Sequence, residues 1–151
     1  MLMNKFMKEA YKEALKAYKE DEVPVGAVIV KDGKIIARAH NKKEKKNDCT
    51  SHAEIECIRK ASKKIGDWYL KDCEIYVTLE PCVMCCGALI KARVDGVYFG
   101  ARDLKAGALG GLFNILNQEG FNHYFKCEYL ETKECGQILK DYFKSKRKKK
   151  N

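Results

Sequence analysis

The chain has 151 residues, which is the size of one compact domain and too short for two ordinary ones. Its composition, 46% hydrophobic and 34% charged with two prolines, is that of a folded protein and excludes intrinsic disorder as the default state. The formal net charge of +9 comes from two lysine-rich segments, residues 42–46 and 140–151, and favours a polyanionic partner such as nucleic acid over a small neutral substrate. A solvated charged surface is the alternative explanation.

The N-terminal part of the chain predicts a helix followed by a β-hairpin. Apolar residues recur every three or four positions from Phe6 to Tyr18, which is typical of an amphipathic helix over about residues 2–20. Pro24 prevents that helix from continuing. Two β-branched runs, residues 25–30 and 35–39, flank an Asp-Gly pair that favours a tight hairpin turn.

The remainder of the chain alternates between strand and helix patterns. We expect helices over about residues 53–64, 82–91 and 133–146, a short helix near 112–118, and strands over 74–79, 96–100 and 125–129. This order predicts an α/β fold with three layers, α/β/α, around a central mixed sheet of about five strands. We assign residues 1–145 to one domain and residues 146–151 to a basic C-terminal tail.

The sequence also predicts the compartment. No apolar run approaches the roughly 20 residues that cross a bilayer, and the N-terminus lacks the pattern of a signal peptide. We therefore expect a cytoplasmic protein without a membrane partner. In a reducing compartment the eight cysteines are expected to be small buried side chains or metal ligands, not disulfides.

Two short segments carry residues typical of a catalytic zinc site. Cys82 and Cys85 are three positions apart at the start of a predicted helix, so both thiols point to the same side. His52, at the start of another predicted helix, is the expected third ligand. Three protein ligands leave the fourth tetrahedral position open for water. Two thiolates neutralise the charge of the zinc, so an added base becomes useful, and Glu54 is placed to be that base.

His52 and Glu54 would point about 200° apart on an ideal helix, so they converge only at an irregular helix start, and we expect His52 near the N-cap. H-x-E together with P-C-x-x-C is the known signature of zinc-dependent nucleobase deaminases, and the match in this chain is complete. In that reaction the metal activates a water molecule that attacks the ring carbon bearing the amine. The glutamate transfers the protons until ammonia leaves.

The cysteines also allow two other interpretations. A thioredoxin-like redox pair would leave His52 and Glu54 without a role. A purely structural zinc site would need a fourth protein ligand. Cys86 is the adjacent candidate, but its direction on the helix differs from that of Cys85 by about 100°.

The segments around these motifs resemble the bacterial tRNA-specific adenosine deaminases, which have the cytidine-deaminase-like fold. The similarity covers nearly the whole chain and includes residues 22–27, 39–41 and 77–85. Residues 100–107, 110–112 and 121–123, which resemble the segments that line the RNA groove of that family, favour tRNA as the substrate. The resemblance implies a homodimer with one zinc per subunit. It also implies hydrolytic deamination of the wobble adenosine of an arginine tRNA with an ACG anticodon.

The same resemblance implies three substrate-binding residues. Asn41 is expected to hydrogen-bond the flipped base, and Asp103 and Lys105 to contact neighbouring nucleotides of the anticodon loop. Without the resemblance these would be an ordinary turn residue and ordinary loop charges. Tyr124 stands where the family often has a basic residue, so one expected phosphate contact is in doubt. An apolar helix face could serve the dimer interface or simply belong to the core: Met84, Ala88 and Leu89.

Two rival functions remain open at this point. The metal motifs alone also fit a deaminase of a free base or nucleotide, such as guanine or deoxycytidylate, which needs neither a basic tail nor an RNA groove. A catalytically silent RNA-binding module that keeps zinc for stability is the other, and the intact Glu54 argues against it.

Overall fold

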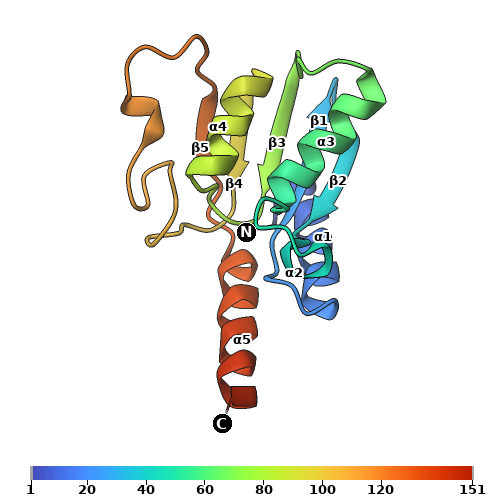
Figure 1. Ribbon diagram of the computed structural model, residues 1–151, viewed down its shortest axis with the longest axis vertical. Helices are drawn as coiled ribbons and strands as arrows, with labels where there is room; N and C mark the ends of the chain where they lie inside the picture. Colours follow the sequence, from blue (N-terminus) through green and yellow to red (C-terminus); the bar gives the residue numbers. More distant parts are fainter. Residues whose placement is uncertain (1, 151) are drawn as a thin grey trace.

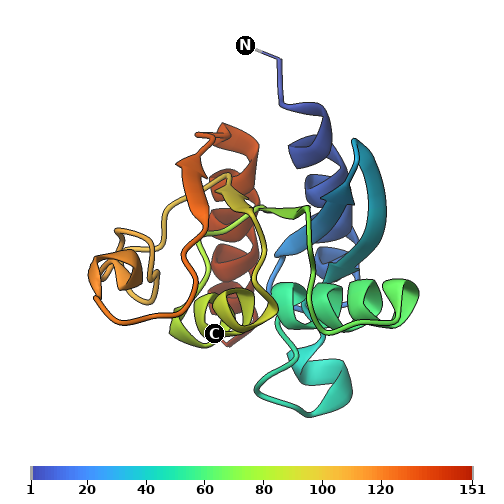
Figure 2. The same cartoon turned by 90° about the horizontal axis from the view of Figure 1, so that it is seen from above.

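The computed structural model describes residues 2–150, in which one sheet lies between two layers of helices (Figure 1). Figure 2 shows α1 (Lys5–Lys19) on one face of the sheet; α5 (Lys133–Lys150) contacts α1 and extends beyond the end of the sheet (Figure 1). The opposite face is covered by α3 (Ala53–Ile65) and α4 (Val83–Ala92). The predicted three-layer α/β/α architecture is confirmed.

The sheet has five strands in the order β2-β1-β3-β4-β5. Strand β1 pairs antiparallel with β2 and β3, whereas β3, β4 and β5 run parallel, so the sheet is mixed as predicted. The strands are β1 (Gly26–Lys31), β2 (Lys34–His40), β3 (Cys73–Val77), β4 (Gly96–Phe99) and β5 (Lys126–Tyr129).

Local chemistry explains the hairpin and the packing of α1. Asp32 and Gly33, between β1 and β2, have φ values of 52° and 75°, the left-handed conformation that two-residue hairpin turns require. Gly26 begins β1 directly beneath α1, and a Cβ there would lie 2.1 Å from the carbonyl oxygen of Ala10. Glycine at this position therefore allows the helix to lie against the strand.

The structure differs from the sequence prediction in three elements. A short helix, α2 (Lys43–Lys46), was not predicted, because it is entirely polar and has no apolar periodicity. The short helix expected near residues 112–118 is one 3₁₀ turn, η1 (Ile115–Asn117). Helix α5 continues to Lys150, because lysine and arginine are good helix formers and are favoured at a helix C-terminus.

The assignment of residues 146–151 to a separate tail stays a prediction. Helix α5 runs through position 146 without a break, and Asn151 lies outside the described residues. Across residues 2–150, every helix is too short or too polar to span a bilayer.

The main core fills the space between the sheet and the α3–α4 layer. Leu89 belongs to this core and is fully buried, whereas Met84 and Ala88 are half-buried, so only those two remain available for an interface.

Candidate active site

The candidate site lies where the N-termini of α3 and α4 meet at one end of the sheet (Figure 1). His52 is the N-cap of α3, with extended dihedrals of φ −72° and ψ 158°. Cys82 is the N-cap of α4, with φ −76° and ψ 176°. The expectation that His52 lies at an irregular helix start is confirmed. Each segment changes from extended to helical backbone at the site. His52 and Glu54, which would point apart on an ideal helix, therefore line the same cavity.

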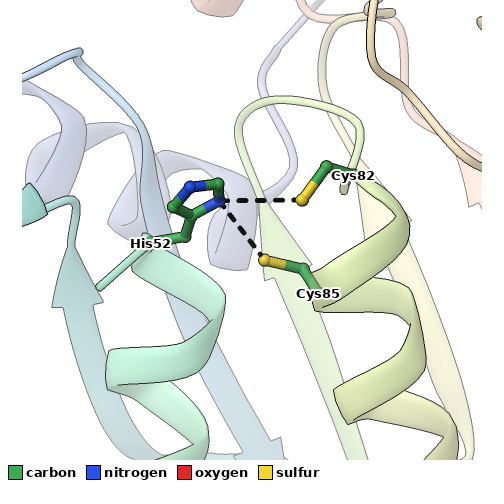
Figure 3. A group of neighbouring side chains, drawn as sticks. All are labelled: His52, Cys82 and Cys85. Carbon is green, nitrogen blue, oxygen red and sulfur yellow. Dashed lines mark hydrogen bonds between the residues drawn. The ribbon is translucent and has the colours of Figure 1, made fainter. Parts of the chain in front are cut away.

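The side chains of His52, Cys82 and Cys85 converge (Figure 3). The Nδ1 atom of His52 lies 3.7 Å from the Sγ of Cys82 and 3.6 Å from the Sγ of Cys85. Tetrahedral zinc, with bonds of about 2.3 Å to sulfur and about 2.0 Å to nitrogen, places these ligand atoms about 3.6 Å apart. The donor set and its two nitrogen–sulfur distances therefore fit zinc.

The site has three donors, not four, within the part of the chain that the structure describes. Cys86 does not join the cluster; its thiol is buried and donates to the carbonyl oxygen of Pro81 at 3.7 Å. This direction agrees with the helical argument against Cys86 as a fourth ligand. A closed structural zinc site is therefore not formed by these residues.

Hydrogen bonds among the three donors shift their pKa values. The pKa of Cys82 is lowered to about 4, first because Cys85 donates a hydrogen bond to its sulfur and then because His52 does. The pKa of Cys85 is raised, because it is the donor in that pair and is buried. The hydrogen bond to Cys82 also raises the pKa of His52. The helix N-termini favour negative charge here as well, so the cluster is suited to bind a cation.

Glu54 lies beside this cluster, in the first turn of α3. The residue is 4% exposed, and burial raises the pKa of its carboxyl group to about 7, with the neighbouring Cys82 adding to the shift. A group that titrates near neutral pH both accepts and returns protons efficiently. The arrangement therefore provides a buried acid–base group next to a cation site.

A cavity of about 180 Å³ opens onto Glu54 and the donor cluster. Its volume equals about six water molecules, which is room for one heterocyclic base. Five of the seven residues proposed from the sequence line it: Asn41, His52, Glu54, Cys82 and Asp103. The remaining wall is mostly apolar, formed by Val23, Val25, Ala53, Leu79 and Ala106.

The three residues expected to bind substrate are placed differently from one another. Asn41 is buried at the cavity wall; its Nδ2 donates to the carbonyl oxygen of Val23 at 3.4 Å, and its Oδ1 accepts from the amide of Lys43 at 3.3 Å. Asp103 is half-buried and lines the cavity. Lys105 is exposed and does not line the cavity, although its backbone amide donates to Asp103 Oδ1 at 3.1 Å.

Two charged lining residues were not identified from the sequence. Lys43 lies at the start of α2, and the sequence placed it in a general charged run. Its position two residues after Asn41 was the available signal. Glu80 is buried at the cavity wall and accepts hydrogen bonds from the backbone of the loop that follows β4. These bonds join residues 23 to 31 positions apart, so no local pattern indicates them.

A second cavity of about 760 Å³ lies at the C-terminal end of α4. Trp68, Arg93 and the segment 121–123 line it, and it shares no lining residue with the smaller cavity. The segment 121–123, which resembles part of an RNA groove, is thus placed away from Glu54 within this chain. His123 is fixed there by a 2.7 Å hydrogen bond between its Nε2 and the carbonyl oxygen of Val94.

The chain is similar to characterised proteins over nearly its whole length. It is 46% identical to the tRNA-specific adenosine deaminase of Aquifex aeolicus, covering 94% of both chains. It is 49% identical to the enzyme of the same name from Bacillus subtilis, covering 96% of this chain and 91% of the relative.

Solved structures give the same grouping. One from studies of A-to-I editing by tRNA:A34 deaminases at the wobble position of transfer RNA matches with a TM-score of 0.83 at 42% identity, covering 89% of this chain and 98% of that chain. Guanine deaminase from Bacillus subtilis matches with a TM-score of 0.65 at 33% identity, covering 94% and 95%. The family model of the MafB19-like deaminases matches residues 1–147. The chain therefore belongs to the MafB19-like deaminase family, together with the tRNA-specific adenosine deaminases of those bacteria.

Proposed function

We propose that this protein is a zinc-dependent hydrolytic deaminase that converts adenosine to inosine at the wobble position of tRNA and releases ammonia. One observation carries the chemistry: an imidazole and two thiols at zinc-ligand spacing lie beside a buried glutamate in a cavity of about 180 Å³. The similarity to tRNA-specific adenosine deaminases at 46% and 49% identity supports the choice of substrate.

His52, Cys82 and Cys85 are the residues that would hold one zinc ion in each subunit. A zinc ion in that position supplies Lewis-acid activation of a water molecule. Glu54 takes the proton of that water on its carboxylate and delivers it to the ring nitrogen of the base. It then takes the second proton, from the hydroxyl group that water has added to the ring carbon, and passes it to the departing amine, so that adenosine and water become inosine and ammonia.

Asn41 orients the base in this proposal. Its carboxamide offers a donor and an acceptor that match the edge of a purine. Wobble bases are unpaired in the anticodon loop, so moving one into the cavity costs less than extracting it from a duplex. Asp103 at the cavity and the exposed Lys105 next to it would contact the flanking nucleotides.

The anticodon stem-loop of tRNA is the proposed partner, and the lysine-rich segments 42–46 and 140–151 supply phosphate attraction. We further propose a homodimer that acts in the cytoplasm. Met84 and Ala88, half-buried on α4, are the interface candidates that the core leaves available.

The proposal is tested by measuring ammonia release from three substrates under the same conditions: an arginine tRNA with an ACG anticodon, free guanine and deoxycytidylate. The zinc-loaded protein is expected to release ammonia from the tRNA at least 100-fold faster than from either small molecule. Faster release from guanine would instead select the function of the Bacillus subtilis guanine deaminase, to which the chain is 33% identical.

A further inference from the structure

A buried carboxylate lies between the metal-ligand segment and the loop that carries Asp103. Glu80 follows β3 and precedes Cys82 by two residues. Its side chain is fully buried, and the residue forms part of the wall of the small cavity. A buried carboxylate is stable only when its oxygens are paired, so the identity of its partners indicates what it does.

The partners of Glu80 are backbone amides of a single loop, residues 101–111. Oε1 accepts from the N–H of Asp103 at 3.1 Å. Oε2 accepts from the N–H of Leu109 at 2.9 Å and from the N–H of Gly111 at 2.8 Å. The charge is balanced by Arg102, whose Nη1 lies 3.8 Å from Oε1. Both oxygens therefore accept hydrogen bonds from the loop.

The loop is shaped around this carboxylate. A Cβ on Gly107 would lie 2.2 Å from Oε2 of Glu80. A Cβ on Gly111 would lie 2.0 Å from the carbonyl oxygen of Asp103 and 2.8 Å from Oε1 of Glu80, so a side chain at either position would displace the carboxylate or the loop backbone beside it. Gly107 also forms a bridge with Cys82, and the amide of Ala108 donates to Pro81 at 2.9 Å. The loop is thus tied to the segment that presents the first thiol.

We propose that Glu80 is a positioning residue for RNA recognition. By fixing the amide of Asp103, it holds the Asp103 side chain at the cavity and the exposed Lys105 beside it. Asp103 Oδ1 completes the turn by accepting from the amides of Lys105 and Ala106, both at 3.1 Å. This inference rests on the proposed function, because the loop matters for catalysis only if it contacts RNA next to the deaminated base.

Glu80→Gln tests the role with little change of shape. The amide oxygen can keep the two bonds to Leu109 and Gly111, but the NH₂ group then faces the N–H of Asp103 and cannot accept from it. Glu74→Gln is the matched control, since Glu74 lies on β3 and accepts from the Tyr98 hydroxyl at 2.7 Å, away from the cavity. Three quantities are compared in zinc-loaded protein: deuterium uptake of residues 101–111, KM for the anticodon stem-loop, and kcat per bound zinc.

For Glu80→Gln we expect faster deuterium uptake in the loop and a KM about tenfold higher, with kcat per zinc within about twofold of the unsubstituted protein. Glu74→Gln should leave all three unchanged. In an Asp103→Ala background, Glu80→Gln should add no further increase in KM. A purely structural role would lower the Tm and the active fraction at an unchanged KM, and that result would overturn the inference, as would fully additive effects with Asp103→Ala.

If Glu80→Gln does not fold, Glu80→Asp carries the test, because it keeps the charge and shortens only the reach. A KM between those of the unsubstituted protein and Asp103→Ala supports the inference, and an unchanged KM overturns it. Deuterium uptake needs no substrate: unchanged uptake in the loop rejects the role of Glu80 alone. A protein that deaminates no RNA rejects the proposed function together with the RNA part of the inference.

Discussion

The two ends of α4 carry two cavities of very different character. The cavity at the C-terminal end is about four times larger, 760 Å³ against 180 Å³, and is lined by exposed Trp68 and Arg93. The smaller cavity at the N-terminal end contains a buried glutamate, an imidazole and a thiol. A helix N-terminus favours anionic side chains, such as the thiolate of Cys82, and a C-terminus favours cationic ones, such as Arg93, which matches this division. The proposed active site is therefore the cavity where reactive side chains converge, although it is the smaller of the two.

The largest expected effect comes from removing the acid–base group of the smaller cavity. Glu54→Ala should lower kcat by about 10²- to 10⁴-fold, because the reaction loses its positioned proton carrier. Zinc content should stay at one per chain, since the three proposed ligands remain. Both quantities are measured on the same preparation, with metal analysis as the control. Near-normal turnover would contradict the assigned mechanism while leaving the metal assignment intact.

Removal of a proposed ligand should separate metal binding from folding. Cys85→Ala is expected to reduce bound zinc from one per chain to near zero and to remove the increase in Tm that zinc gives the unsubstituted protein. Cys86→Ala, one residue away, is the matched control and should retain zinc. Equal zinc loss in both variants would mean that Cys86 belongs to the metal site after all.

The buried carboxyl group of Glu54 predicts a pH dependence in the metal-free protein. Its pKa rises from 4.5 to about 7 on folding, so the folded state holds a proton that the unfolded state releases. The associated stability is fully present below pH 4.5 and is lost as the pH rises through about 7, by up to about 3 kcal/mol. Denaturant unfolding at pH 5 and pH 8 should give a larger decline for the unsubstituted protein than for Glu54→Gln. Parallel declines would contradict the shift.

The smallest effect is expected at the larger cavity. Ser62→Ala changes a half-buried lining residue inside α3, where alanine is the better helix former. We expect kcat within about twofold and a stability change within about 0.5 kcal/mol, measured by inosine formation and thermal unfolding. A tenfold loss of turnover would show that the larger cavity takes part in the reaction and would contradict its separation from the smaller one.

Local patterns were sufficient to predict much of this protein. Helix and strand periods, an Asp-Gly turn and the spacing of Cys82 and Cys85 are encoded within a few residues of one another, and the structure confirms the four longer helices, the five strands, the turn and the cysteine pair. The convergence of His52 with the cysteines spans 30 to 33 positions and was predicted because the chemistry of zinc requires a third ligand.

Features that depend on long-range backbone contacts were not predictable. Glu80 lies beside a proline and a cysteine and resembles an ordinary residue at the end of a strand, whereas its partners lie in a loop more than 20 positions away. Helix α2 is held by Glu22, whose carboxylate accepts from the amides of Glu44 and Lys45 at 2.9 and 2.7 Å. In both cases a buried acidic side chain fixes a segment that is distant in the sequence. The sequence of that segment does not indicate the contact.

The position of inosine in tRNA is the most direct test of the proposed deamination of the wobble adenosine. An arginine tRNA with an ACG anticodon is incubated with the zinc-loaded protein and sequenced for inosine, alongside the same tRNA with guanosine at the wobble position and alongside Glu54→Ala. We expect inosine at the wobble adenosine alone, and none with Glu54→Ala. Absence of inosine with zinc bound, or inosine formed equally well by Glu54→Ala, would contradict it.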